Sequence, residues 1–363
     1  MGRGCAPHRR DRVDQAPRTR EAPAPARVMK AKTAAIIATG SCLPDTIRRN
    51  DDPIFDYLNN NPGTANLGLF EGYDTRRVLA PGEQLADLMV SAAKSALQRA
   101  ALTAADIDLL IGYATVSTWE MPNDLFTVAI ELGLPSTTAI IPINNEYSNF
   151  NQSVVIADAL ISTGRATRAL VVVGTNWTRH IDYKTPAAIS IGDGAGAAVV
   201  AMSGDPALFR VRDVATDADP QYMGGMYVSA DPTQPPIVPP TFGGPVFHLT
   251  PTGIEAFKNW GPAEPPRLVQ QVLSRNGLSA SDIAFIPHQT STVLNQAWQE
   301  ALQPAVFVQT LAKYGNMTAA NIPVNFDVCA AEITTSHVAL VGLGPEPSCN
   351  VVLLERAAPV SGA

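Results

Sequence analysis

Two segments about half a chain apart carry the same pattern of residues. Residues 97–107 and 273–283 share leucine, arginine, leucine, alanine, aspartate and isoleucine at a constant offset of 176 residues in a chain of 363. Each copy has the composition of a helix end, a short polar loop and the start of an apolar strand. We therefore predict two similar halves that arose by duplication; chance similarity over a short span is the alternative.

Apolar runs alternate with helix-like patterns along both halves. Residues 83–101 place leucine, methionine and alanine side chains on one face, which predicts an amphipathic helix. Further helices are expected at residues 149–160 and 266–276. Buried strands are predicted at the apolar runs 34–39, 109–116, 139–143, 169–174, 283–287, 338–343 and 350–354. This alternation predicts an α/β fold with mostly buried sheets.

Residues 1–32 differ from the rest of the chain in charge and composition. Seven arginines and two lysines stand against three acidic residues, a local net charge of +6 in a chain of net charge −7. Abundant proline and alanine predict a disordered basic extension. It is a flexible tail, an extension upstream of a start at Met29, or an arm for nucleic acid or an acidic carrier protein. The acidic body, at −13, argues against nucleic acid as the main partner.

The sequence lacks the signals of several other classes of protein. The four cysteines, at positions 5, 42, 329 and 349, form no CxxC pair and no zinc-spaced cluster with histidine, so no metal site is predicted. Reduced thiols in the cytoplasm are the ordinary expectation for such cysteines. No run approaches the ~18 apolar residues of a membrane span, and residues 1–32 lack the apolar core of a secretory signal.

Three polar segments end or follow predicted strands. Glu146, Tyr147 and Ser148 lie between a strand and a helix, where backbone N–H groups and the helix dipole favour an anionic nucleophile or an oxyanion. His288 lies at the end of another strand, and Asn316 lies in a third polar segment. Taken singly, each segment also suits a turn or a structural histidine.

Together these segments resemble the beta-ketoacyl-ACP synthase III branch of the thiolase superfamily over residues 33–357. The matching motifs are ATGSCLP at 38–44, DTRR at 74–77, IGDGAGA at 191–197, FIPHQ at 285–289, YGNMTAANIP at 314–323 and GLG at 342–344. The resemblance implies a thiolase fold of five αβαβα layers, with duplicated halves at 33–205 and 206–363. It also implies a homodimer and thioester substrates carried on acyl carrier protein or CoA, with no further cofactor.

The family's active site is a Cys-His-Asn triad at the junction of the halves. The cysteine takes the acyl group, while histidine and asparagine hold the malonyl thioester carbonyl and stabilise the enolate after decarboxylation. His288 and Asn316 map onto these two roles, which suit neutral hydrogen-bond donors. The family's Cys-x-Gly-Phe elbow reads Tyr147-Ser-Asn-Phe150 here. Tyr147 therefore stands at the nucleophile position.

A phenol changes what this position can do. At pH 7 the anionic fraction falls from roughly 3% for cysteine to about 0.1% for tyrosine, or about 2 kcal/mol. In the favoured interpretation, Tyr147 still takes an acyl group or activates an acceptor in an unusual acyltransferase or condensing enzyme. In the others, His288 and Asn316 decarboxylate a malonyl-type thioester without a covalent step, the chain is a non-catalytic subunit of a heterodimeric synthase, or Ser148 is the nucleophile.

Other positions also depart from the family pattern. Glu146 stands where a small residue is usual; it acts as a general base with a raised pKa, or points away. The last glycine loop contains Pro345 and Pro347, which have no N–H, and Glu346, whose carboxylate is unfavourable beside an oxyanion. These departures make acyl-cysteine chemistry improbable, and indicate an enzyme of specialised metabolism.

The remaining predictions concern substrate contacts. Residues 44–76 lack the tryptophan segment that stacks on CoA in relatives, which favours a carrier-protein thioester. Arg76 is expected to meet a phosphate or to be solvated. Met121 aligns with the loop that reaches into the partner's pocket. Phe150, Gly344 and Glu346 are also expected at the substrate site, and residues 235–251 form a loop over its entrance.

Overall fold

The computed structural model describes residues 34–61, 69–119, 121–202, 207–229, 246–345 and 347–357. The predicted disordered extension, the boundary at residue 205 and Glu346 lie outside these residues, as does most of the predicted entrance loop. Within the described ranges, no helix is long and apolar enough to cross a membrane.

Ten strands form one mixed sheet that is built from two five-stranded halves. In the first half the order is β1-β7-β6-β4-β5, and in the second it is β8-β14-β13-β11-β12. In each half the first two pairings are antiparallel and the last two are parallel. The bounds are β1 Ala34–Cys42, β4 Leu109–Thr115, β5 Ala139–Pro142, β6 Arg168–Thr175, β7 Gly194–Met202, β8 Phe209–Ala218, β11 Ile283–Pro287, β12 Val306–Phe307, β13 His337–Gly344 and β14 Ser348–Arg356. The identical order supports the predicted duplication.

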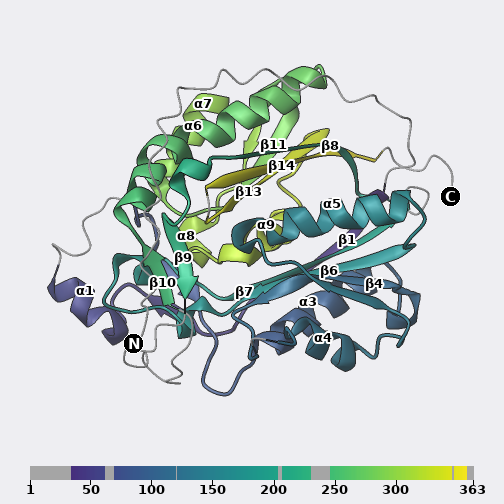
Figure 1. The fold of residues 1–363 in the computed structure, drawn as a ribbon, viewed down its shortest axis with the longest axis horizontal. Coiled ribbons are helices and arrows are strands. Elements are labelled where there is room, and N and C mark those ends of the chain that lie inside the picture. The colour runs from purple at the N-terminus through teal and green to yellow at the C-terminus, as the bar shows by residue number, and fades with distance from the viewer. Residues whose placement is uncertain are drawn as a thin grey trace, which may run out of the picture. The chain divides into compact units, whose positions relative to one another are not determined.

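The helices complete five layers, as Figure 1 shows. Helices α3 and α4 pack on the outer face of the first half-sheet, and α6 and α7 on that of the second. Helices α5 and α9 lie between the half-sheets, where their apolar side chains form the central core. The bounds are α3 Leu85–Arg99, α4 Leu125–Leu132, α5 Asn149–Ser162, α6 Pro251–Arg275, α7 Thr292–Leu302 and α9 Asn321–Val328. The predicted five-layered α/β fold is confirmed.

Small elements border this frame. Strands β2 and β3 pair with each other, as do β9 and β10. The bounds are β2 Ile47–Arg49, β3 Thr75–Arg77, β9 Met226–Ser229, β10 Val246–Leu249, α1 Asp56–Asn60 and α8 Leu311–Tyr314. Strand β10 and the start of α6 occupy the end of the segment that was predicted to be an entrance loop, so that prediction is wrong for residues 246–249 and 251.

The repeated sequence forms the same structure twice. Helices α3 and α6 end 176 residues apart, at Arg99 and Arg275. A short turn follows each of them and is closed by a reciprocal capping box, Thr103 with Asp106 and Ser279 with Asp282. The shared threonine or serine and the shared aspartate therefore have a local structural cause.

Helix α6 is longer than the sequence predicts. The prediction began at residue 266, but the helix runs through Pro262, Pro265 and Pro266. A proline inside a helix leaves the carbonyl four residues earlier without its N–H partner. For Pro265 that carbonyl belongs to Gly261, and it accepts a hydrogen bond of 2.8 Å from the Trp298 indole of α7. Packing against α7 thus gives the Gly261 carbonyl the hydrogen-bond donor that Pro265 lacks.

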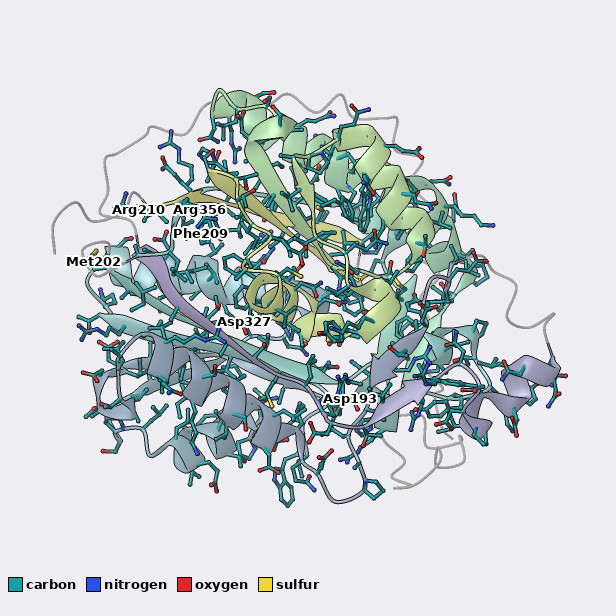
Figure 2. All side chains as sticks on the ribbon, turned by 180° about the vertical axis from the view of Figure 1, so that it is seen from behind. Asp193, Met202, Phe209, Arg210, Asp327 and Arg356 are labelled. Atoms are coloured by element: carbon teal, nitrogen blue, oxygen red, sulfur yellow. The ribbon has the colours of Figure 1, made fainter. Side chains whose placement is uncertain are left out.

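Two carboxylates near the centre tie loops and helices to the sheet, and Figure 2 labels both. Asp327 of α9 accepts a 2.7 Å hydrogen bond from Thr39 Oγ1 of β1. Asp193, fully buried just before β7, accepts one of 2.5 Å from Thr178 Oγ1. Because Thr178 follows Trp177 directly, Asp193 fixes the turn that presents this indole to the site described next.

Candidate active site

The site forms where the N-termini of α5 and α9 meet. A short 3-10 turn precedes each helix, Glu146–Ser148 before α5 and Thr318–Ala320 before α9. The first residue of each turn has a positive φ, 35° at Glu146 and 40° at Thr318. Such values are unfavourable for residues other than glycine, and most of all for a β-branched one. Strained backbone at equivalent places in both halves marks the junction as a candidate functional site.

Asn316 is held so that its amide donor is available to a ligand. Its Oδ1 accepts hydrogen bonds from the Thr318 backbone N–H at 2.8 Å and from Asn321 Nδ2 at 2.9 Å. Because a backbone N–H can only donate, the acceptor must be the amide oxygen, which fixes the orientation of the group. Asn316 lines the cavity of the site. Its NH₂ group is therefore the part left to contact a bound molecule.

His288 follows β11 and is completely buried. Burial lowers the pKa of His288 to about 3, with the Thr318 backbone acting in the opposite direction, so the ring is neutral at physiological pH. Asn321 Nδ2 lies 3.3 Å from His288 Nδ1. An amide donor at Nδ1 favours the tautomer with its proton on Nε2. Nε2 is also buried and has no hydrogen-bond partner among the described residues, so it is the candidate for a second donor to a bound oxyanion.

Tyr147 lies flat against His288. The two ring centroids are 4.5 Å apart and the rings are inclined by only 13°. A hydrogen bond to an imidazole nitrogen lies in the plane of the imidazole ring, whereas the phenol is stacked on its face. In this arrangement His288 is not placed to take a proton from the Tyr147 hydroxyl.

Glu146 turns its carboxylate toward Trp177. Oε1 accepts a 3.0 Å hydrogen bond from the indole Nε1. Burial of the carboxyl group raises the pKa of Glu146 to about 7, although Trp177 and the nearby Thr115 and Thr318 hydroxyls lower it. The site therefore contains a carboxyl group that can gain or lose a proton near neutral pH.

A mainly apolar cavity leads to these polar groups. Tyr147, His288, Asn316 and Thr318 form its polar end, and Gly344 also lines it. The apolar walls come from both halves and include Phe70, Trp177, Ile181, Ile191, Met226, Phe247, Phe257, Trp260, Leu294 and Leu343. An apolar channel that ends at a few convergent polar groups is typical of a small-molecule site.

Known proteins are similar to this chain in sequence. The sequence family described as 3-Oxoacyl-[acyl-carrier-protein (ACP)] synthase III matches residues 142–220, and its C-terminal counterpart matches residues 273–355. The beta-ketoacyl-[acyl-carrier-protein] synthase III of Alkalilimnicola ehrlichii is 30% identical over 300 residues, which cover 81% of this chain and 89% of the relative. A Streptomyces avermitilis relative of the same name is 30% identical over 286 residues, 75% of this chain and 84% of that one. The chain belongs to the beta-ketoacyl-ACP synthase III family.

Solved structures of this family and its neighbours have the same fold. The 3-oxoacyl-[acyl-carrier-protein] synthase III of Aquifex aeolicus superposes with a TM-score of 0.74 at 24% identity, covering 89% of this chain and 99% of that one. The priming beta-ketosynthase of the R1128 polyketide pathway gives 0.78 at 23% identity, over 92% and 100% of the two chains. The chain is thus a synthase III-like member of a family of acyl-transferring condensing enzymes.

Not every predicted residue lies at the active site of this synthase III-like protein. Ser148 is fully buried, and its Oγ faces Gly342, where a side chain would come within 2.7 Å of it. Phe150 is 1% exposed in the central core between the half-sheets. Neither residue lines the apolar cavity. Of the elbow residues, Tyr147 lines this cavity and Glu146 reaches the site through Trp177.

Arg76 and Met121 also lie apart from the cavity. The Arg76 side chain is completely buried, with Nη2 donating to Asn50 Oδ1 at 2.6 Å and to the Ile189 carbonyl at 2.5 Å. Its guanidinium also stacks on Phe55, 5.0 Å from the ring centroid. These contacts indicate a structural arginine, neither solvated nor placed for a phosphate. Met121 is 84% exposed on the loop before α4.

Sequence reasoning missed three residues that shape the site. Thr318 lies in the turn before α9, Trp177 binds Glu146, and Asn321 joins Asn316 to His288. Asn321 had a signal, because it begins α9 as Asn149 begins α5. Within the described ranges, no cluster of three or more His, Cys, Asp or Glu side chains could hold a metal ion.

Proposed function

We propose that this protein is a condensing enzyme that acts on acyl and malonyl thioesters without forming an acyl-enzyme at residue 147. The observation that carries this proposal is the pair of donors, His288 Nε2 and the Asn316 amide, at the polar end of one cavity. Loss of carbon dioxide from a malonyl thioester leaves an enolate, whose oxygen these neutral donors would stabilise. The enolate carbon would then attack the carbonyl of a second, non-covalently bound thioester.

The stacked phenol supports the absence of a covalent step. Tyr147 covers a face of His288, so this imidazole is not placed to remove the proton of the phenol. A phenol with a pKa near 10 needs such help to become a nucleophile at neutral pH. Its ring also takes up space at the polar end of the cavity. Tyr147 therefore serves better as a wall for the bound thioester than as an acyl carrier.

Decarboxylation alone is the second candidate, and the same geometry favours it. If the enolate takes a proton in place of attacking a second thioester, the product is an acetyl thioester. Both reactions use His288 and Asn316 in the same way, and differ only in what the enolate meets. A non-catalytic subunit would not need two donors oriented at the end of an apolar cavity, which argues against that alternative.

The working assembly is proposed to be a cytoplasmic homodimer that uses carrier-protein thioesters in specialised metabolism. Strand β5 is one of the two edges of the sheet, and α4 packs beside it. Large apolar side chains are exposed around this edge, with Trp119 62%, Met121 84% and Ile130 76% exposed. A second copy would cover such a patch. The specialised role rests on the altered elbow and the proline-containing last loop.

One experiment separates these possibilities. The purified protein is incubated with malonyl and acyl thioesters of both CoA and a carrier protein, and carbon dioxide, products and intact-protein mass are followed. A ketoacyl product without a protein adduct supports condensation, and an acetyl thioester supports decarboxylation. An acyl adduct on Tyr147 would contradict the non-covalent proposal. No turnover of any thioester by the homodimer would point to the subunit alternative.

A further inference from the structure

The proposed chemistry needs a proton that the oxyanion donors do not supply. When a malonyl thioester loses carbon dioxide, the electron pair of the broken C–C bond passes into the enolate. In simple decarboxylation the enolate carbon must take one proton. In condensation, the thiolate released from the acyl thioester must take one. The neutral His288, with its pKa lowered to about 3 by burial, holds too little of its acid form at neutral pH to provide it.

Glu146 lines a second cavity and contacts two residues, Trp177 and Thr318, that line the apolar one. Its carboxylate is bonded to Trp177, which lines the apolar cavity with Thr318. Glu146 itself lines the second cavity, an open hollow on the other side of the turn. The other residues of that hollow are Ile143, Asn144, Asn145, Gln152, Ile156 and Pro345. Its polar side chains can hold water in contact with the solvent.

We propose that Glu146 is the proton relay of this site, passing a proton from water in the second cavity to the reacting thioester. The inference rests on the proposed function. In the balanced step, the Glu146 carboxyl gives its proton to the hydroxyl of Thr318, which lines the apolar cavity and passes its own proton to the enolate carbon or to the leaving thiolate. The resulting carboxylate then takes a proton from water. Each turnover thus consumes one proton, as both reactions require.

The surroundings of the Glu146 carboxyl group allow it both to give and to take a proton. The Trp177 N–H holds Oε1, and the Thr115 and Thr318 hydroxyls also contact the carboxyl group, so Thr318 is placed to receive its proton. The titratable groups around it are Tyr147 on its own turn, His288 after β11 and Tyr113 on β4. Burial, and secondly the charge of Glu146, raises the pKa of Tyr113. None of these three neighbours is a cation that would keep Glu146 ionised.

The positive φ of Glu146 gives a second, independent reason for its position. A φ of 35° directs the side chain away from the course it would take in ordinary helical backbone. The strained turn therefore points the carboxyl group at Trp177 while the next residue, Tyr147, stacks on His288. Consecutive residues thus line different cavities, Glu146 the second one and Tyr147 the apolar one.

The test follows malonyl-CoA turnover from pH 5.5 to 8.5 with the wild-type protein, Glu146→Gln and the exposed control Glu300→Gln. Carbon dioxide release and final product are measured in water, and the deuterium content of any acetyl product in D₂O. Wild type and Glu300→Gln should lose rate as pH rises through the ionisation of Glu146. Glu146→Gln should be about 10²-fold slower in product formation, and its rate should not follow that ionisation.

The outcomes distinguish the relay from the proposed function. Wild-type turnover that is abolished in His288→Ala but unchanged in Glu146→Gln, with the same pH profile, would overturn the relay and leave the function standing. No turnover of malonyl thioesters by the wild type would overturn both. Glu146→Asp, which keeps a carboxyl group at a shorter reach, should recover part of the rate; recovery no better than that of Glu146→Gln would count against proton transfer by this side chain.

Discussion

The turns before α5 and α9 have the same backbone and different chemistry. Each is a 3-10 turn whose first residue has a positive φ, and an asparagine begins the helix that follows. The turn before α9 belongs to a network in which Asn321 bridges Asn316 and His288. The turn before α5 carries Glu146 and Tyr147, which bind Trp177 and stack on His288.

Duplication explains the backbone that the two turns share, and the side chains that differ between the halves explain their different chemistry. Duplication provides two helix N-termini that meet between two half-sheets, and so a place where backbone N–H groups converge. In the proposed mechanism, the second half supplies the groups that hold a carbonyl or enolate oxygen. The first half, which would carry the acyl group in the family's ordinary chemistry, instead carries a phenol and a carboxyl group. The reaction can therefore change in one half while the electrophile-binding half is kept.

The largest effect is expected from removing a donor of the second half. His288→Ala deletes one oxyanion donor and should lower the turnover of thioesters by about 10²–10³-fold. Asn316→Ala should act similarly, since both side chains would donate to the same oxygen in the proposed mechanism. Steady-state rates with malonyl thioesters measure this. His337→Ala, at the start of β13, is the matched control and should keep full activity; undiminished activity in His288→Ala would contradict the whole mechanism.

A smaller effect is expected from Asn321, which positions the donors without contacting substrate. Asn321→Ala removes a buried side chain that binds Asn316 Oδ1 and the Gln289 carbonyl. Unfolding free energy should fall by about 1–3 kcal/mol, and turnover by about 10-fold, because the Asn316 amide loses a fixed orientation.

The equivalent change in the other turn is the control. Asn149→Ala removes a buried asparagine whose Oδ1 accepts from the Asn145 N–H. It should cost similar stability but less activity, because Asn149 touches neither donor. Thermal denaturation and turnover of both variants measure the difference. Equal losses of activity would show that the two turns are functionally alike.

The carboxyl group of the half-buried Glu146 should make stability depend on pH. Burial raises the pKa of Glu146 from 4.5 to about 7, so between these values the folded state binds more protons than the unfolded state. This contribution to stability is fully present below pH 4.5 and is lost as pH rises through about 7. Glu146→Gln should therefore gain stability over the wild type between pH 5 and 8, by about 1 kcal/mol or roughly 2–4 °C.

Melting temperatures of both proteins at several pH values measure this change. The control Glu300→Gln lies on the outer helix α7 and is exposed. Its difference from the wild type should not depend on pH. If Glu146→Gln behaves in the same way, the Glu146 carboxyl group is not enclosed as described.

Much of the fold could be predicted from the sequence because its causes are local. Strand β11 was predicted at the residues where it occurs, 283–287, since an apolar run ends there at a proline and a polar segment. The capping boxes in the repeated segments also depend only on neighbouring residues. Helix α6 could not be predicted across Pro265, because Trp298 supplies the missing donor from another helix.

The residues of the candidate site also divide into those that could be predicted from local sequence and those that could not. His288 and Asn316 were predicted because they lie in motifs of the family. The contact between Glu146 and Trp177 joins residues 31 positions apart, and depends on how two loops meet. The burial of Arg76 likewise follows from carbonyl partners that only the folded chain brings together. Local patterns identified which segments matter, but not which way their side chains point.

The smallest effect on turnover is expected from removing the hydroxyl of Tyr147, the residue that stands at the family's nucleophile position. Tyr147→Phe keeps the ring that stacks on His288 and removes only the hydroxyl oxygen, so turnover should stay within about twofold of the wild type. A loss of 10-fold or more, at unchanged stability, would mean that the oxygen takes part in the reaction.

Tyr147→Cys is the informative partner of this variant, because a thiol at a helix N-terminus ionises readily. Intact-protein mass after acyl-CoA treatment should show an acyl adduct in Tyr147→Cys and none in the wild type or Tyr147→Phe. That pattern would show that the first half still has the geometry for covalent catalysis and has lost only the nucleophile. An adduct on the wild-type Tyr147 would instead mean that the two halves are complementary parts of an acyl-enzyme mechanism.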